Sequence, residues 1–122
     1  AFLLLYLPST CSFRMTDIWR SYIAQRIAWS CGWSILFHNS TVWQERNNHN
    51  LLNDFIDEIS GYTNAELIYE SLTNLDLREG VENISINMII CYQKLVDLEL
   101  IDASEMDLLN RWINDVTLLN LY

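Results

Sequence analysis

Apolar residues recur at intervals of three and four from residue 51 to the C-terminus, and this spacing restricts that part of the chain to amphipathic helices. A first helix should begin near Leu51 and end before Gly61. A second should start from a capping box, in which the side chains of Thr63 and Glu66 bind free backbone amides of the first turn. The pattern therefore predicts helices, and no sheet, in the second half of the chain.

Two further helices are expected after Gly80, which breaks the pattern. A long helix should span residues 84–98, and Asp102 and Glu105 are spaced like the start of a last helix. The apolar stripe of the long helix consists of Ile84, Met88, Cys91, Leu95 and Leu98. No internal repeat or linker interrupts this series.

The first part of the chain has a different pattern. Residues 2–7 form an apolar run that ends at Pro8, and residues 33–37 form a second run; both are interpreted as short strands. Between them the spacing predicts a helix from Thr16 to Cys31, with Thr16 as its N-cap and Gly32 at its far end.

The predicted fold class is α+β, predominantly helical. Residues 1–50 should form strand, helix, strand and loop, and residues 51–122 an acidic helical subdomain that caps them. The length is that of one domain. Because the chain begins at Ala1 without a methionine, directly in an apolar run, we expect it to be a piece of a longer protein. That run is far shorter than the roughly 20 residues that cross a bilayer.

Charge is distributed unevenly along the chain, whose formal net charge is −9. Residues 1–50 carry four arginines against Asp17 and Glu45, a balance of +2, whereas the remaining residues carry −11. An acidic surface repels phosphate polymers, so general nucleic-acid binding is excluded. The arginines of the first part still allow it to bind one small anion.

Cysteine and histidine spacing argues against a metal or redox motif. Cys11, Cys31 and Cys91 contain no C-x-x-C pair, which excludes a zinc knuckle and a thioredoxin-type site. His38 and His49 lack a third ligand at suitable spacing. We expect buried free thiols, with one disulfide as the alternative in an oxidising compartment, and no metal site.

Arg14, Asp17 and Arg20 follow one another at three-residue spacing, which brings their side chains together on a helix. One interpretation is a structural ion pair at a helix start, where Asp17 also meets the positive end of the helix dipole. The other is an anion site, in which an arginine binds phosphate or carboxylate and Asp17 accepts a proton. The spacing alone does not decide between them.

The polar segment 42–50 is a second candidate constellation. A loop that closes over a substrate would need donors and acceptors of this kind. The alternative is a solvated connection that ends in a helix N-cap at Asn50 or Asn53. The candidate side chains are Gln44, Glu45, Arg46, Asn47 and His49.

The charge cluster and the polar segment belong to one longer motif. It consists of Pro8, Thr10, Ser12, Arg14-x-x-Asp17-Ile18-Trp19-Arg20-x-Tyr22-x-x-Gln25-Arg26-x-x-Trp29, Gly32 and Thr41-Val42-x-Gln44-Glu45-Arg46-Asn47-x-His49. This motif resembles the C-terminal part of the STELLO-like family, plant glycosyltransferases whose animal relatives are catalogued as a domain of unknown function. Residues 42–49 are more similar to the animal relatives.

The resemblance implies the C-terminal, acceptor-side portion of a nucleotide-sugar-dependent transferase with a GT-A-like α/β fold. Such an enzyme has an upstream membrane anchor in the Golgi and a luminal catalytic part, where a DxD motif holds Mn²⁺ or Mg²⁺ against the donor diphosphate. The nearest acidic pairs here, in Asp97-Leu98-Glu99 and Glu105-Met106-Asp107, are interpreted as ordinary surface acids. The chain alone is therefore expected to be inactive and to hold no cofactor.

The resemblance also implies roles for single residues. Asp17 is the candidate catalytic base or acceptor contact, and Arg14 and Arg20 are candidates for binding the donor diphosphate or for holding Asp17. Trp19 could stack on a sugar, although core packing is favoured, and Gln25 could bind substrate or cap a buried carbonyl. The remaining substrate-binding candidates are Gln44, Arg46 and His49.

Two other functions stay open. In a non-catalytic helical interaction domain, the acidic helices would bind a protein partner and the Arg14–Arg20 cluster would only stabilise the fold. In a small anion-binding domain, the same cluster would be complete in itself. Glycosylation sequons at Asn39 and Asn83 suit a luminal protein, but matches of this number are expected by chance.

Overall fold

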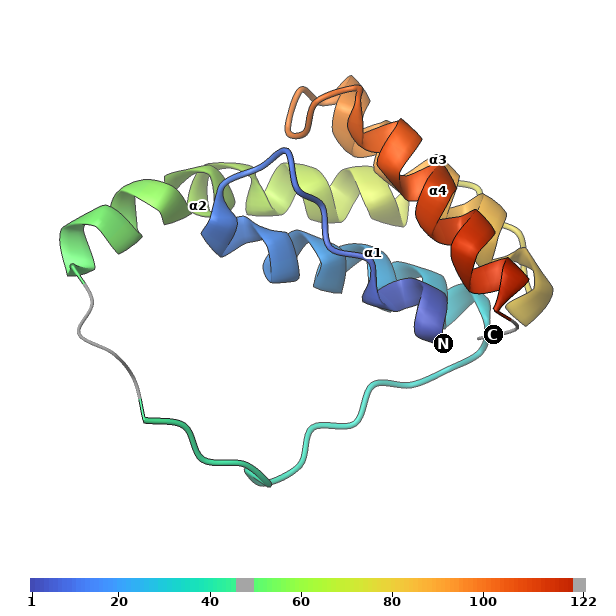
Figure 1. Ribbon diagram of the computed structural model, residues 1–122, viewed down its shortest axis with the longest axis horizontal. Helices are drawn as coiled ribbons and strands as arrows, with labels where there is room; N and C mark the ends of the chain where they lie inside the picture. The colour runs from blue at the N-terminus through green and yellow to red at the C-terminus, as the bar shows by residue number, and fades with distance from the viewer. Residues whose placement is uncertain (46–49, 120–122) are drawn as a thin grey trace.

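The computed structural model describes residues 1–45 and 50–119, and all regular structure in these ranges is helical (Figure 1). The α-helices are α1 (Thr16–Ser30), α2 (Leu51–Thr73), α3 (Ile84–Asp97) and α4 (Glu105–Leu118). Short 3-10 helices precede α1 and α3, namely η1 (Phe2–Leu5), η2 (Phe13–Met15) and η3 (Val81–Asn83).

The predicted α+β class, with N-terminal strands from a GT-A-like α/β fold, is therefore wrong. Residues 2–5 form η1, in which the Leu4 N–H donates to the Ala1 carbonyl at 3.1 Å. Residues 33–37, the second predicted strand, have no regular structure. A strand needs a neighbouring strand for its backbone groups, and the described ranges contain none. The turn of η1 instead closes on itself and buries Leu3 among the helices.

Helix α1 agrees with the predicted span Thr16–Cys31 to within one residue. Its buried stripe consists of Trp19, Ile23 and Ile27. The helix ends in a Schellman motif, because Gly32 has a φ of +71° and the Trp33 N–H donates to the Ala28 carbonyl at 2.9 Å. The predicted N-cap is wrong: the Thr16 hydroxyl donates to the Phe13 carbonyl at 3.0 Å, inside the preceding turn.

Helix α2 is continuous where two helices were predicted to meet. A mid-helix glycine costs only about 1 kcal/mol, and Gly61 lets α2 approach the Met15 sulfur, which a Cβ at this position would overlap. The Thr63 hydroxyl donates to the Ile59 carbonyl at 2.9 Å instead of forming a capping box. The helix is capped by Asn50, one of the two predicted alternatives, whose side chain accepts from amides of the first turn.

Helices α1 and α2 lie side by side and run in the same direction (Figure 1). Helix α3 packs against both of them, and α4 packs against α3 and η1. The buried cluster between these elements includes Leu3, Tyr6, Met15, Trp19, Ile68, Met88, Cys91, Tyr92, Leu95 and Leu109. All three cysteines are free, with Cys91 buried and the other two half-buried. No helix in the described ranges has the length and hydropathy needed to cross a bilayer.

The connection between α2 and α3 is held by Asn87, a fully buried amide. Its Oδ1 accepts from the Arg78 N–H at 3.0 Å, and its Nδ2 donates to the Arg78 carbonyl at 2.8 Å. The Gly80 N–H donates to the Ser30 carbonyl at 3.0 Å, which ties the connection to the end of α1. At Gly80 the φ of 97° and ψ of 153° define a conformation that is nearly restricted to glycine.

We expect Gly80→Ala to lower the free energy of unfolding by about 1–3 kcal/mol, because the backbone conformation is nearly restricted to glycine. The exposed Glu82 carboxylate, which lies where the new methyl group would be, can move away. Gly32→Ala is the matched control: Gly32 also has a positive φ, but open space surrounds its Cβ position. Its loss should be smaller, about 1 kcal/mol. Urea unfolding of both variants measures the difference, and equal losses would contradict this account of Gly80.

Candidate functional site

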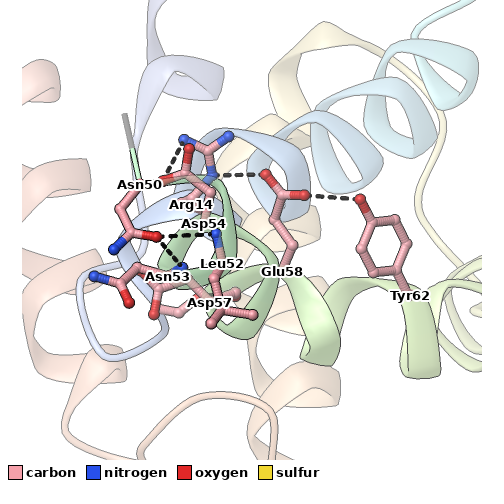
Figure 2. Close-up of polar contacts among 9 residues, drawn as sticks. Arg14, Asn50, Leu52, Asn53, Asp54, Asp57, Glu58 and Tyr62 are labelled. Carbon is pink, nitrogen blue, oxygen red and sulfur yellow. Dashed lines mark hydrogen bonds and ion pairs between the residues drawn. The ribbon is translucent and has the colours of Figure 1, made fainter. Parts of the chain in front are cut away.

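Arg14 fastens the turn before α1 to the start of α2 (Figure 2). Its Nε donates to Glu58 Oε1 at 2.6 Å, and its Nη1 lies 3.5 Å from Asp54 Oδ1. The second oxygen of Glu58 accepts from the Tyr62 hydroxyl at 2.7 Å. The guanidinium of Arg14 is thus held by two carboxylates of α2, and not by Asp17.

Arg14, Asp54, Glu58 and Tyr62 together form the Arg14 clamp. Its contacts favour the ionised forms of Arg14 and Glu58. Hydrogen bonds from Tyr62 and Arg14 hold the pKa of Glu58 below its ordinary value. The hydrogen bond to Glu58 raises the pKa of Arg14 and also that of Tyr62. The clamp therefore stays charged at neutral pH and fixes η2, with the first turn of α1, against α2.

Asp17 is exposed in the first turn of α1 and forms no ion pair with any residue of the described ranges. It lines an open hollow of about 460 Å³ whose other walls come from η2, the preceding segment and α2. The lining residues are Leu7, Phe13, Arg14, Thr16, Asp17, Ile18 and Glu58. The structure thus brings Asp17 and Arg14 to one hollow without pairing them.

Trp19 and Arg20 are both more buried than Asp17. Trp19 is 2% exposed and belongs to the core, and its indole nitrogen has no hydrogen-bond partner in the described ranges. The buried Nε of Arg20 likewise lacks a partner there. Burial raises the pKa of Tyr92 on α3, and the positive charge of Arg20 partly opposes this shift. Arg20 therefore acts on the α3 side of the molecule.

Gln25 lies in a second hollow, between the C-terminal halves of α1 and α2, with a volume of about 110 Å³. The lining residues are Tyr22, Gln25, Arg26, Trp29, Tyr69, Leu72 and Thr73. The side chain of Gln25 has no hydrogen-bond partner in the described ranges. Arg26 is occupied, because it donates to the carbonyls of Leu72 at 2.9 Å and Leu75 at 2.7 Å at the end of α2.

The aromatic walls of this hollow were not identified from the sequence. Tyr22 and Trp29 form an apolar stripe on α1 with Ile18, and such a stripe normally packs in a core. In the structure Trp29 is 48% exposed and Tyr69 is 54% exposed. The one available signal was angular: around α1, this stripe is offset from the stripe of Trp19, Ile23 and Ile27, which is buried.

The polar segment supplies no assembled site in the described ranges. Gln44 is exposed, in a stretch without regular structure. Arg46 and His49, two further predicted substrate-binding residues, lie outside the described residues. Across residues 1–45 and 50–119, no group of three or more His, Cys, Asp or Glu side chains is placed to hold a metal ion.

Glu105 was interpreted as a surface acid, and that interpretation is wrong. The side chain is fully buried and accepts hydrogen bonds from the Tyr6 hydroxyl, the Ser9 and Thr10 amides at 3.0 and 2.9 Å, and the Thr10 hydroxyl at 2.7 Å. Burial alone raises the pKa of Glu105, but these hydrogen bonds outweigh it and hold the pKa below its ordinary value. Glu105 therefore holds residues 6–10 against the start of α4.

The family model described as STELLO glycosyltransferases matches residues 14–122, from the Arg14 clamp to the end of the chain. No curated protein matches the chain, and no solved structure matches it. Because the match covers well over half of the chain, including Asp17 and all four α-helices of the described ranges, the chain belongs to the STELLO glycosyltransferase family.

Proposed function

We propose that the chain forms the acceptor-side portion of a nucleotide-sugar-dependent glycosyltransferase and that Asp17 contacts the acceptor hydroxyl as its base. One observation supports this assignment above the others: Asp17 is exposed at an open hollow and is not neutralised by either neighbouring arginine. A structural ion pair would have enclosed it. By family resemblance, the enzyme works on the luminal side of the Golgi membrane.

In the proposed reaction the acceptor oxygen forms a bond to the anomeric carbon of the donor sugar, and the bond to the nucleoside diphosphate breaks. The proton of the acceptor hydroxyl moves to Asp17. A general base must lie within hydrogen-bond reach of that proton, and a carboxylate without an ion pair has both oxygens free to accept it. The nucleoside diphosphate leaves with the electrons of the broken bond.

The two arginines have different parts in this proposal. Arg14 is a positioning residue, since its guanidinium is held by Asp54 and Glu58 and fixes the turn that carries Asp17. Arg20 forms no hydrogen bond or ion pair in the described ranges, but it does not line the hollow at Asp17 and its charge acts on Tyr92 of α3. It stays a candidate for the donor diphosphate only if the donor reaches that side of α1. The sequence also made Arg14 a candidate for binding the diphosphate. In that role Arg14 would have to break its contacts with Asp54 and Glu58.

The family also implies Mn²⁺ or Mg²⁺ bound with the donor. The described residues do not fit this ion, because they assemble no cluster of carboxylate ligands and a hard cation requires several oxygen ligands. We therefore assign no step of the reaction to a cation on this part of the chain. Its ligands belong to the donor-binding part of the enzyme.

One observation favours the alternative, a non-catalytic interaction domain. The first three turns of α2 expose a contiguous set of apolar side chains, and exposed apolar patches mark interaction surfaces. The set consists of Leu51, Leu52, Phe55, Ile56 and Ile59. A transferase could have the same surface, in contact with another part of the enzyme. An assay of glycosyl transfer therefore decides between the two functions.

The test is an assay of the full-length protein with a panel of nucleotide sugars, Mn²⁺ or Mg²⁺, and neutral glycan acceptors. We expect release of nucleoside diphosphate with at least one donor, and faster release when an acceptor is present. Absence of both transfer and hydrolysis with every donor, in a protein that is folded by circular dichroism, would favour the interaction domain.

A further inference from the structure

The two hollows beside α1 are parts of one groove. A third hollow of about 260 Å³ lies between them and is lined by Met15, Ile18, Tyr22, Glu58, Gly61, Tyr62 and Ala65. It shares Ile18 and Glu58 with the hollow at Asp17, and it shares Tyr22 with the hollow at Gln25. The seam between α1 and α2 is thus open along its length. From Asp17 to Trp29 it measures about 18 Å at 1.5 Å per residue.

Aromatic side chains line this groove at a regular spacing. Tyr22 and Trp29 are seven residues apart on α1, and Tyr62 and Tyr69 are seven residues apart on α2. Seven residues are two helical turns, so each pair projects from one face at a separation of about 10 Å. Because α1 and α2 are parallel, the two pairs advance together along the seam (Figure 1).

The polar groups of the groove are available to a ligand. The side chains of Tyr22, Gln25, Trp29 and Tyr69 form no hydrogen bonds in the described ranges, although each carries a polar group. Trp29, Tyr62 and Tyr69 are about half exposed or more. Sugar rings have apolar C–H faces and hydroxyl edges, so aromatic planes flanked by free donors and acceptors match them on both counts.

Charge gives an acidic polymer no advantage in this groove. Its lining carries Arg14 and Arg26 against Asp17 and Glu58, a formal balance of zero. Both arginines are also occupied, Arg14 by two carboxylates and Arg26 by carbonyls at the end of α2. A phosphate or sulfate polymer would find no free cation here and would meet the net charge of −9 of the chain, whereas a neutral sugar chain needs no counter-charge.

We infer that the acceptor is a neutral oligosaccharide, bound lengthwise along the α1–α2 groove. Its reacting end lies at Asp17, and its preceding sugars stack on Tyr22, Tyr62, Tyr69 and Trp29. The assignment of the reacting end rests on the proposed transferase function. The stacking of a neutral sugar chain does not, since it follows from the groove itself.

The test is to measure, by calorimetry, how tightly the full-length protein binds neutral oligosaccharides of increasing length. The series are oligosaccharides of glucose, mannose and N-acetylglucosamine. Affinity should rise with length in at least one series. Trp29→Ala and Tyr69→Ala should weaken binding of the longest member at least tenfold, comparable to the loss of one stacking platform. Trp43→Ala is the matched control, because Trp43 is also exposed but lies outside the groove. It should bind like the wild type.

The outcomes separate the inference from the proposed function. If no oligosaccharide binds more tightly than its monosaccharide, or if Trp29→Ala and Tyr69→Ala bind like the wild type, the groove is not the sugar site. Preferential binding of a sulfated oligosaccharide of equal length would also overturn the inference. Normal groove binding with no transfer from any nucleotide sugar would leave the inference intact and contradict the transferase function.

Discussion

Glu105→Ala should lower the free energy of unfolding by about 3–5 kcal/mol, because several donors lose their acceptor and each one left unsatisfied in the interior costs about 1–3 kcal/mol. The substitution leaves the Tyr6 hydroxyl and the amides of Ser9 and Thr10 without their acceptor in the interior. Whole domains are stable by only about 5–15 kcal/mol, so this single change removes a large share. Thermal and urea unfolding measure the loss.

Asp107→Ala is the control for this prediction. Asp107 lies in the same first turn of α4 and carries the same charge, but it is exposed. Its removal changes the net charge and the interaction with the helix dipole equally, without opening the buried network. A loss for Asp107→Ala as large as that for Glu105→Ala would show that charge at the helix start, and not the buried network, is what stabilises the fold.

The same carboxylate makes stability depend on pH. The folded pKa of Glu105 lies below its ordinary value of 4.5, so the folded chain releases this proton more readily than the unfolded chain. The stabilisation is complete above pH 4.5 and is lost as the pH falls through the folded pKa. Glu105→Gln, which retains one acceptor oxygen, should lose less stability than Glu105→Ala. It should also show a flatter decline below pH 4.5 than the wild type.

Asp17→Asn should reduce the turnover of the full-length enzyme by about 10²–10⁴-fold, the usual contribution of a general base. Asparagine keeps the shape of the side chain but cannot accept the proton. Because Asp17 is exposed and unpaired, the fold loses only its interaction with the helix dipole, so the unfolding temperature should change little. Acceptor KM should change far less than kcat. Steady-state transfer kinetics at saturating donor measure both constants.

Asp107→Asn is the matched control, since both aspartates are exposed in the first turn of a helix. It should retain full activity. Unchanged turnover of Asp17→Asn would exclude the base role. A rise in acceptor KM without a fall in kcat would instead make Asp17 a binding contact, which sequence alone left as the alternative.

Periodicity was a good guide where one helix face is buried. The stripe through Met88 on α3 is in the core, as the spacing predicted. It failed where tertiary packing overrides a local signal. Gly61 is a helix breaker by propensity, but contact with Met15 makes a small residue favourable there. Residues 2–5 have strand-like composition, yet a strand without a partner leaves its backbone unpaired.

The site could be located only in part, for the same reason. Local spacing put Asp17 at the start of α1 and left open whether it pairs with the arginines. Arg14 is held instead by Asp54 and Glu58, some forty residues further along the chain. Glu105 meets Thr10 at a separation of 95 residues. No pattern within one segment encodes such contacts. The motif from Pro8 to His49 nevertheless resembled the STELLO-like family, and the match to residues 14–122 confirms that family.

The most direct test of the central claim, that the α1–α2 groove holds the acceptor, is amide hydrogen exchange of the full-length protein with and without a saturating neutral oligosaccharide. We predict slower exchange in peptides that cover residues 14–30 and 58–73, with no change in α4. Protection confined to α3 and α4, or none in the groove when the oligosaccharide is bound, would contradict the account.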